Sequence, residues 1–390
     1  MSSRQRMLAV LNHQEPDHIP LMLHPGGFVP PAHLGLPWAD DQVSQARCWL
    51  KMGLDAWLGI GPPLVFHPDV NIRQWVETIP GEPYPCMIKE YDTPAGVFRQ
   101  EVYQTKDWHS HEWLPHGQSP KVELLDDYNV VRYRRCPIQD EGDIEKLKYL
   151  YRPTPDEAVP AFRQKAQAVA RQAEELGVLL IASPSAGADA AMWLCGGQNL
   201  LNMAIDRPDL LEPLLAVIHT RNKRSVELLL DTPVELIFRR GYYEGTAFWS
   251  PAMYRRFFMP HIAELARMVH QGGRKFAYTM SVGYLPLLEM FVEMGIDVHY
   301  LLDPIAGGAE VDLARVKKVY DGKLSVIGGI NEPITLQRGT PEQIRHEVQR
   351  TVQELGPRGL ALTPAEAIFN HTPWRNIEIL LDAWRELGVR

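Results

Sequence analysis

The chain alternates short apolar runs with longer segments in which apolar residues recur every three or four positions. Short apolar runs of about four to eight residues are typical of strands, and the three-to-four spacing is typical of helices with one buried face. The pattern therefore predicts repeated strand-then-helix units. The eight predicted strands cover residues 18–24, 56–61, 179–185, 234–240, 275–281, 297–302, 324–330 and 360–366.

The connections between the later strands carry clear helix signals. Ser250 and Pro251 suit the N-cap and the first position of a helix, and Gly272 with Gly273 suits its end. Strand-helix units pack as a parallel sheet with right-handed connections, and eight of them close into a barrel with the helices outside. We therefore predict an α/β fold consisting of a single (β/α)8 TIM barrel over residues 1–390.

One stretch interrupts this pattern. Residues from about 68 to 145 are rich in proline, aromatic residues and alternating positions, which predicts an antiparallel β-ribbon inserted after the second strand. Insertions after barrel strands lie on the C-terminal face, where active sites are built. We expect this β-rich insertion to form a lid or wall within the barrel domain. It contains His109 and His111, two residues apart, but this pair alone is a weak metal signal.

Composition limits the possible partners. The chain is 45% hydrophobic and 23% charged, which is typical of a folded globular protein. Its net charge of −8 and its lack of a long basic block argue against nucleic-acid or membrane partners, so we expect a small-molecule substrate. The N-terminus lacks the apolar core of a signal peptide, which predicts a cytoplasmic protein. The four cysteines lie far apart and are expected to be buried thiols, without a disulfide framework.

Four segments resemble the uroporphyrinogen decarboxylase superfamily. They are RQRMLAVLNHQEPDHIP, GGQNLLNMAIDRPDLLEPLL, SPAMYRRFFMPHIAELARMVHQGG and GTPEQIRHEVQRTVQELG followed by TPWRNIEILLDAW. The superfamily includes heme-pathway decarboxylases and corrinoid-linked methyltransferases, all with a (β/α)8 barrel. The chain resembles a divergent member of the superfamily, nearer to the methyltransferase branch.

This chain departs from the site residues of both branches of the superfamily. Where the decarboxylases carry an arginine-rich stretch of the type MRQAGRY, this chain has LHPGGFVPP, and its second strand leads into GIGPPLVFH without an acidic residue. The missing arginines argue against uroporphyrinogen as substrate, because each of its carboxylates needs a cation. The methyltransferases hold zinc with a His-x-Cys pair and a further Cys, where this chain has Thr279, Ser281 and Glu366. We therefore expect no metal.

The candidate site residues lie at or near the predicted C-terminal ends of the strands, where barrel enzymes place reactive groups. GGINEP after the seventh strand is interpreted as a close-packed turn. The catalytic candidates are Glu366, His299 and Glu244, with Glu366 as the main acid. The substrate-binding candidates are His24, Arg240, Tyr243, Tyr278, Thr279, Ser281 and Asn370, and His371 lies just beyond them.

Three functions remain open. The favoured one is corrinoid-linked methyl transfer from a small, methoxy-aromatic type of substrate, with a corrinoid as methyl carrier on a partner protein and no covalently bound cofactor. The second is decarboxylation of a small aromatic or pyrrolic carboxylate. The third is a non-catalytic barrel that binds a tetrapyrrole or corrinoid. The resemblance also leaves room for a homodimer.

Overall fold

A computed structural model describes residues 1–105, 132–184, 186–369 and 371–388. Its centre is a curled parallel sheet in the order β14-β13-β10-β9-β8-β7-β2. The order follows the chain, as expected when each strand is joined to its neighbour through an outer helix. The strands are β2 (Trp57–Ile60), β7 (Leu179–Ala182), β8 (Leu236–Arg240), β9 (Lys275–Thr279), β10 (Val298–Leu302), β13 (Ser325–Ile330) and β14 (Leu360–Pro364).

The segment predicted as the first strand joins the two edges of this sheet. Leu21 forms a parallel bridge with Leu362 in β14, and Met22 forms one with Asp55, just before β2. These contacts place an eighth chain segment between β14 and β2. The predicted (β/α)8 barrel is therefore confirmed, with its first strand reduced to two bridges. Pro20 contributes no N–H to a longer ladder, which is one reason for the short pairing.

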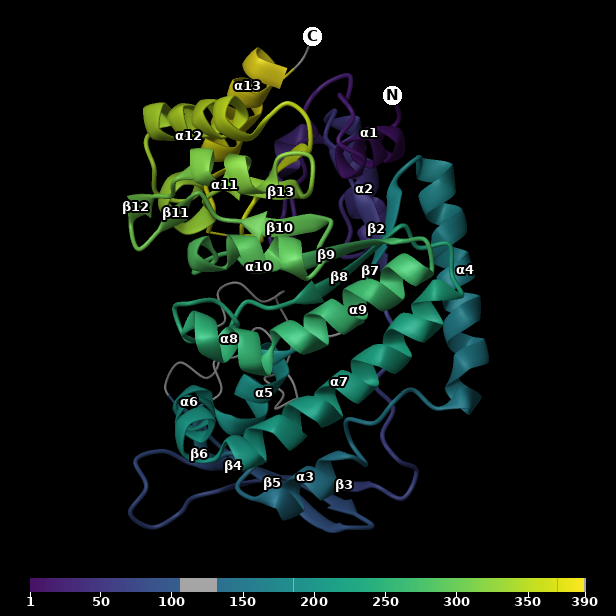
Figure 1. Ribbon diagram of the computed structural model, residues 1–390, viewed down its shortest axis with the longest axis vertical. Coiled ribbons are helices and arrows are strands. Elements are labelled where there is room, and N and C mark those ends of the chain that lie inside the picture. The colour runs from purple at the N-terminus through teal and green to yellow at the C-terminus, as the bar shows by residue number, and fades with distance from the viewer. Residues whose placement is uncertain (106–131, 185, 370, 389–390) are drawn as a thin grey trace.

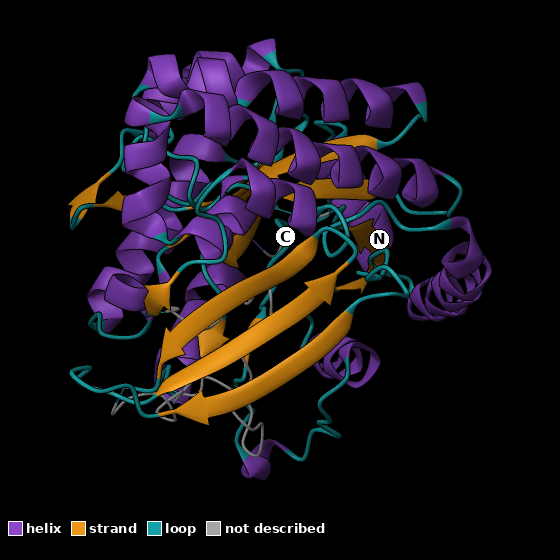
Figure 2. Ribbon diagram, turned by 90° about the horizontal axis from the view of Figure 1, so that it is seen from below, coloured by secondary structure: helices purple, strands orange, loops and turns teal. Residues whose placement is uncertain are grey.

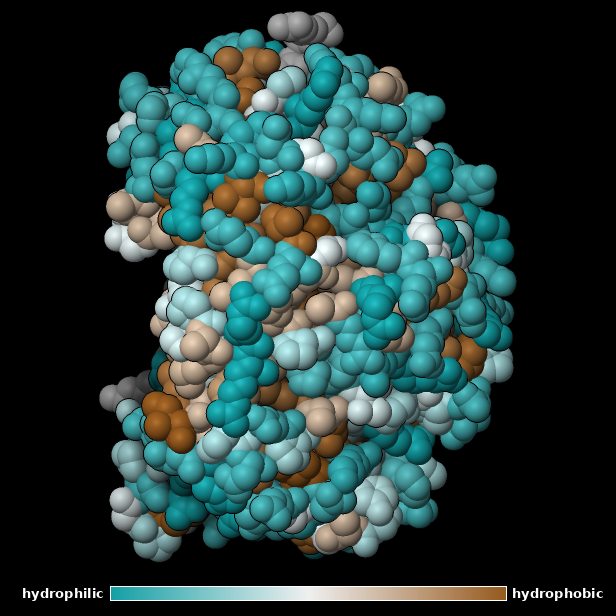
Figure 3. Space-filling view, viewed as in Figure 1, coloured by the Kyte–Doolittle hydropathy of each residue, from teal (hydrophilic) through white to brown (hydrophobic). Residues whose placement is uncertain are grey.

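Outer helices cover the barrel, and Figure 1 shows α7 and α9 running beside each other outside the strands. Figure 3 shows that the surface in this view is mostly hydrophilic, with smaller apolar areas between the polar ones. No helix in the described part of the chain is long and apolar enough to cross a membrane. The main covering helices are α2 (Gln42–Lys51), α4 (Val159–Leu176), α7 (Pro208–Leu230), α9 (Met259–Gln271), α10 (Leu288–Glu293), α11 (Leu313–Tyr320), α12 (Pro341–Leu355) and α13 (Trp374–Gly388).

A first helix, α1 (Ser3–Leu11), packs against the barrel interior. Its side chains Met7, Val10 and Leu11 share one buried cluster with inward-facing strand residues such as Leu236. The helix begins with a capping box between Ser2 and Gln5, which satisfies its first backbone N–H groups. α1 fills the N-terminal side of the barrel, so a ligand is expected at the C-terminal side.

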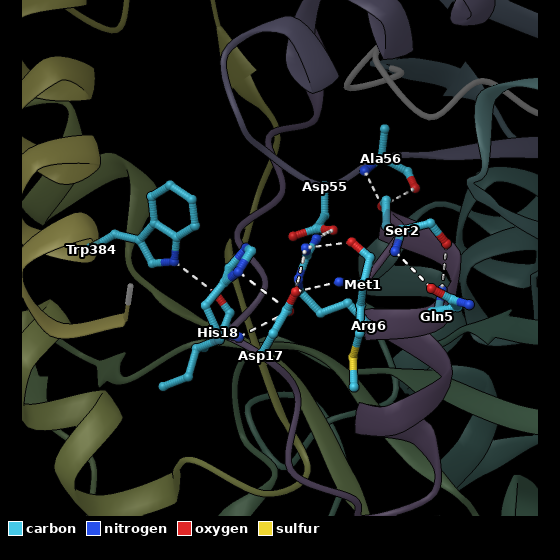
Figure 4. Close-up of polar contacts among 11 residues, drawn as sticks. Met1, Ser2, Gln5, Arg6, Asp17, His18, Asp55, Ala56 and Trp384 are labelled. Carbon is cyan, nitrogen blue, oxygen red and sulfur yellow. Dashed lines mark hydrogen bonds and ion pairs between the residues drawn. The ribbon is translucent and has the colours of Figure 1, made fainter. Parts of the chain in front are cut away.

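Arg6 fixes α1 to the barrel, as Figure 4 shows. Its guanidinium Nη1 donates to Asp55 Oδ1 at 2.6 Å, and its Nε donates to Asp17 Oδ1 at 2.6 Å. Asp55 is fully buried, so its charge depends on this partner.

We expect Arg6→Met to lower the free energy of unfolding by about 3 kcal/mol, because it leaves Asp55 buried without its cation. The matched control is Arg4→Met on the same helix, since Arg4 is half-exposed in its pair with Glu235 and should cost less than about 1 kcal/mol. Denaturant unfolding measures both. Equal losses in the two variants would contradict the role of Arg6.

The inserted stretch forms a four-stranded antiparallel sheet after β2, so the predicted antiparallel ribbon is confirmed. Figure 2 shows its strands side by side on one side of the molecule. Tyr133 ties the sheet to helix α5 (Ala188–Cys195) by donating from its hydroxyl to the backbone oxygen of Trp193. A lid function stays a prediction, and His109 and His111 lie outside the described residues. The strands are β3 (Asn71–Glu77), β4 (Cys86–Thr93), β5 (Gly96–Tyr103) and β6 (Tyr133–Arg135).

Shorter elements occupy the connections, and they include two small strand pairs and three further helices. The four cysteines are buried, and none forms a disulfide. The elements are β1 (Pro25–Gly26) with β15 (Ile368–Phe369), β11 (Ile305–Ala306) with β12 (Ala309–Glu310), α3 (Glu141–Leu147), α6 (Gly197–Asp206) and α8 (Pro251–Phe257).

Candidate active site

A cavity of about 570 Å³ lies at the C-terminal ends of β8, β9, β13 and β14. This is the barrel face on which catalytic residues are found in enzymes of this architecture. The lining combines one arginine and two glutamates with aromatic and small apolar side chains. The lining residues are Arg240, Tyr242, Tyr243, Phe248, Ser281, Val282, Glu332, Pro333, Gln337, Glu366, Ala367, Phe369 and His371.

Four of the predicted site residues line this cavity: Arg240, Tyr243, Ser281 and Glu366. Alternation along β8 explains the position of Arg240, because Leu236 and Phe238 on the same side of the strand belong to the barrel interior. Ser281 follows β9 and donates from its hydroxyl to the backbone oxygen of Ala365 at 3.1 Å. This bond holds the end of β9 against the residue that precedes Glu366.

Glu244 and Tyr278 lie elsewhere, on the outer side of the strands. Glu244 forms a buried ion pair there with Arg239. Arg239 Nη2 donates to Glu244 Oε1 at 2.7 Å, and the Tyr278 hydroxyl donates to Glu244 Oε2. The backbone N–H of Ala188 also donates to Glu244, at 2.8 Å. Burial and the nearby Glu244 charge raise the pKa of Tyr278 well above its usual value, so the phenol stays neutral. This geometry gives Glu244 a structural partner rather than access to the cavity.

His299 is also outside the cavity lining. It is fully buried on the outer side of β10, where its Nε2 lies 2.7 Å from the backbone oxygen of Met280 and its Nδ1 lies 3.1 Å from the Tyr320 hydroxyl. The carbonyl oxygen is an acceptor only, so Nε2 carries the proton and Nδ1 accepts. Burial lowers the pKa of His299 to about 4, which keeps the imidazole neutral. A catalytic role for His299 stays a prediction that its position does not support.

His24 and Thr279 face the barrel interior. His24 Nε2 lies 2.8 Å from the hydroxyl of Tyr300, and burial lowers the pKa of this imidazole to about 4. Burial raises the pKa of the Tyr300 phenol, and the charges of Arg240 and Glu366, which line the cavity, also act on it. The Thr279 hydroxyl is fully buried and has no hydrogen-bond partner among the residues that the structure describes. Asn370 lies outside the described residues.

Glu332 lines the cavity and was missed by the sequence analysis. It follows β13 in the GGINEP segment, which we interpreted only as a turn. It is 2% exposed and accepts a hydrogen bond from the Thr372 hydroxyl at 2.6 Å. Burial raises the pKa of this carboxyl group above its usual value. Its position two residues after β13 could have identified it as a candidate, because barrel enzymes place reactive groups at the C-terminal ends of strands.

The zinc centre of the related methyltransferases does not fit this donor set. The Ser281 hydroxyl is engaged with a backbone carbonyl, and the Thr279 hydroxyl is a weak ligand for zinc. Within the described residues, no three His, Cys, Asp or Glu side chains lie close enough together to hold a metal ion. The arginine, glutamate and histidine side chains that line the described part of the cavity are Arg240, Glu332, Glu366 and His371.

Comparison with known proteins identifies relatives of about two thirds of the chain. The chain is 26% identical to a uroporphyrinogen decarboxylase of Gloeobacter violaceus over 262 residues, which are 65% of this chain and 71% of the relative. It is 24% identical to a uroporphyrinogen decarboxylase of Thermus thermophilus over 70% of this chain and 76% of the relative.

The fold also matches a methyltransferase from Methanosarcina mazei, with a TM-score of 0.61, 15% identity and coverage of 99% of both chains. At this identity the match describes the fold and leaves the reaction open. The family model for uroporphyrinogen decarboxylase (URO-D) covers residues 128–387. The chain therefore belongs to the uroporphyrinogen decarboxylase family.

Proposed function

We propose that this protein transfers a methyl group from a small methoxy-substituted aromatic carboxylate to a reduced corrinoid presented by a carrier protein. The observation that carries this proposal is the convergence of Arg240, Glu332 and Glu366 in one cavity with aromatic walls. Such a combination suits a flat apolar molecule with one anionic group and one oxygen that needs a proton.

Arg240 binds the substrate carboxylate in this proposal. A guanidinium forms two parallel hydrogen bonds with a carboxylate, which fixes both position and orientation. Tyr242, Tyr243 and Phe248 offer aromatic faces and edges for the ring of the substrate. Among the described cavity residues, Arg240 is the only arginine or lysine. This supports a substrate with a single carboxylate over one with many.

Glu366 supplies the proton. Breaking the bond between the methyl carbon and the aryl oxygen leaves an electron pair on that oxygen, and protonation of the oxygen yields a neutral phenol. The methyl group passes to the reduced corrinoid, which provides the electron pair for the new bond. Glu332 is the second carboxyl group in the cavity, and its raised pKa suits a group that donates a hydrogen bond to the bound substrate.

Decarboxylation of a similar acid is the second candidate, because the relatives with sequence similarity are uroporphyrinogen decarboxylases and because an arginine and two acids share the cavity. The charge of Arg240 favours methyl transfer over decarboxylation. A carboxylate held by Arg240 is stabilised in its charged ground state. Loss of carbon dioxide moves that charge onto the ring carbon, away from the guanidinium.

One experiment separates the candidates. Wild-type protein is mixed with chemically reduced cobalamin and each methoxybenzoate isomer, and methylated cobalamin and carbon dioxide are measured in parallel. We expect methylated cobalamin and the matching hydroxybenzoate. Carbon dioxide without methyl transfer would favour the decarboxylase. Neither product, together with tight corrinoid binding, would favour the binding-protein alternative and contradict both enzymatic functions.

A further inference from the structure

The loop that carries Glu332 into the cavity is held in a tight turn by its own first residue. Asn331 precedes the short π-helical segment η4 (Glu332–Leu336) as its N-cap. Its side-chain Oδ1 accepts hydrogen bonds from the backbone N–H groups of Ile334 at 2.7 Å and Thr335 at 3.1 Å. The Asn331 side chain thus fixes the backbone on both sides of Glu332.

A carboxyl group from an outer helix binds the same turn. Glu347 lies on α12 and is 4% exposed. Its Oε1 accepts from the backbone N–H of Asn331 at 2.7 Å, and its Oε2 accepts from the Thr335 hydroxyl at 2.8 Å. One side chain therefore contacts the residue before Glu332 and a residue three positions after it.

A third acid completes the arrangement from the neighbouring strand. Asp303 follows β10, and its Oδ1 and Oδ2 accept from Asn331 Nδ2 at 3.0 and 2.8 Å. Its Oδ1 also accepts from the backbone N–H of Ile305 at 2.8 Å. Asn331 is therefore bonded through its backbone N–H, its side-chain oxygen and its side-chain nitrogen. Thr372 then fixes the Glu332 carboxyl group itself.

We propose that Glu347 is a positioning residue that, through Asn331 and Thr335, holds Glu332 at the substrate cavity. Glu347 does not line the cavity, so it acts only through the turn. The part that concerns substrate rests on the proposed function, whereas the placement of Glu332 by Glu347 does not.

The electrostatics of the turn agree with this role. Burial raises the pKa of Glu347 to about 8, against the hydrogen bonds from Asn331 and Thr335, and the nearby Asp303 raises it further while Arg350 lowers it. Burial also raises the pKa of Asp303 to about 6. Around Glu332, burial raises the pKa while the Thr372 hydrogen bond and the charges of His371 and Arg338 lower it. A largely protonated Glu347 offers one acceptor oxygen and one donor at neutral pH, as glutamine does, and the Thr335 hydroxyl can donate or accept at the second position. Glu347→Gln is therefore a conservative replacement.

The test measures Glu332 directly. Glutamate is labelled with carbon-13 at the side-chain carboxyl, the Glu332 signal is assigned with Glu332→Gln, and its titration is followed in each variant. In Glu347→Leu we expect the Glu332 pKa to fall toward that of an ordinary exposed glutamate, because the turn loosens and water reaches the carboxyl group. We expect Glu347→Gln to keep the raised pKa. Hydrogen exchange at residues 332–337 should accelerate at least tenfold in Glu347→Leu alone.

The matched control is Glu354→Leu, which makes the same change on the exposed face of the same helix. An unchanged Glu332 titration in a folded Glu347→Leu variant would overturn the proposal, as would equal effects in Glu347→Leu and Glu354→Leu. If Glu347→Leu does not fold, Glu347→Asp takes its place, because its shorter side chain cannot span both contacts. None of these readouts needs a substrate, so failure of the proposed methyl transfer would leave the result intact.

The same carboxyl group predicts how stability depends on pH. Its pKa is about 8 in the folded protein and close to that of free glutamate after unfolding, so the folded state binds more protons between these values. Its contribution to stability is therefore complete at low pH and is lost as the pH rises toward about 8. We expect the unfolding midpoint of Glu347→Gln to rise relative to that of the wild type between pH 5 and pH 8. A constant difference across this range would contradict the raised pKa.

Discussion

Replacing Glu366 with glutamine is expected to lower kcat by about 100-fold or more, as for the loss of a general acid. Glu366 lies at the end of β14 and lines the cavity beside Arg240. Glutamine keeps the shape of the side chain but has no proton to give to the departing oxygen. Because Glu366 is only partly buried, we expect a change in unfolding free energy of less than about 1 kcal/mol.

The control for Glu366→Gln is Glu175→Gln, which makes the same change on the exposed surface of α4. Steady-state rates with the methoxybenzoate isomer that the wild type turns over, and thermal unfolding of all three proteins, complete the comparison. Wild-type turnover by Glu366→Gln would show that this carboxyl group has no part in proton transfer.

The second large effect concerns stability. Arg239→Met should lower the free energy of unfolding by about 3–5 kcal/mol, because it leaves the Glu244 carboxylate fully buried without its cation. Gly187 packs directly against this ion pair, since a Cβ atom there would lie 1.8 Å from Arg239 Nη2 and 2.1 Å from Glu244 Oε1. Denaturant unfolding followed by circular dichroism measures the loss.

Two matched variants test the reason for this loss. Arg256→Met removes a half-exposed ion pair with Glu212 and should cost less than about 1 kcal/mol. The double variant Arg239→Met/Glu244→Gln removes the unpaired charge and should recover part of the stability of the single variant. An additive loss in the double variant would contradict the ion-pair explanation.

The barrel could be predicted because its information is local and repeated. Each strand is a short apolar run and each covering helix has its own three-to-four pattern, so eight units support one another. The first strand is the weakest prediction. Its apolar residues Leu21 and Met22 occupy the expected place between β14 and β2, but only isolated bridges form there. The apolar pattern predicts which residues are buried, but it does not predict how many backbone hydrogen bonds they form with the neighbouring strands.

The site was predicted in part, and strand alternation explains most of the difference. Arg239 and Arg240 are chemically identical in the sequence, but one faces the outer helices and the other the cavity. Similarly, His299 points outward, whereas its neighbour Tyr300 belongs to the barrel interior with Leu236. Reading inward and outward positions from the apolar residues of each strand would have separated these pairs.

Glu332 illustrates what alternation alone could not give. It lies beyond the end of β13, where the backbone turns, so its direction depends on the contacts of Asn331 with Asp303 and Glu347. These partners are 28 and 16 residues away in sequence. No local sequence pattern specifies such contacts. A glutamate on a helix has the same sequence context whether it forms an ion pair, binds a turn or is protonated.

The most direct test of the central claim is a crystal structure of the protein with the methoxybenzoate isomer that it turns over. We expect the substrate carboxylate on the Arg240 guanidinium, the ring between the aromatic cavity side chains, and the methoxy oxygen within hydrogen-bond distance of Glu366. A methoxybenzoate bound elsewhere, or bound in this cavity with its methoxy oxygen directed away from Glu366 and Glu332, would contradict it.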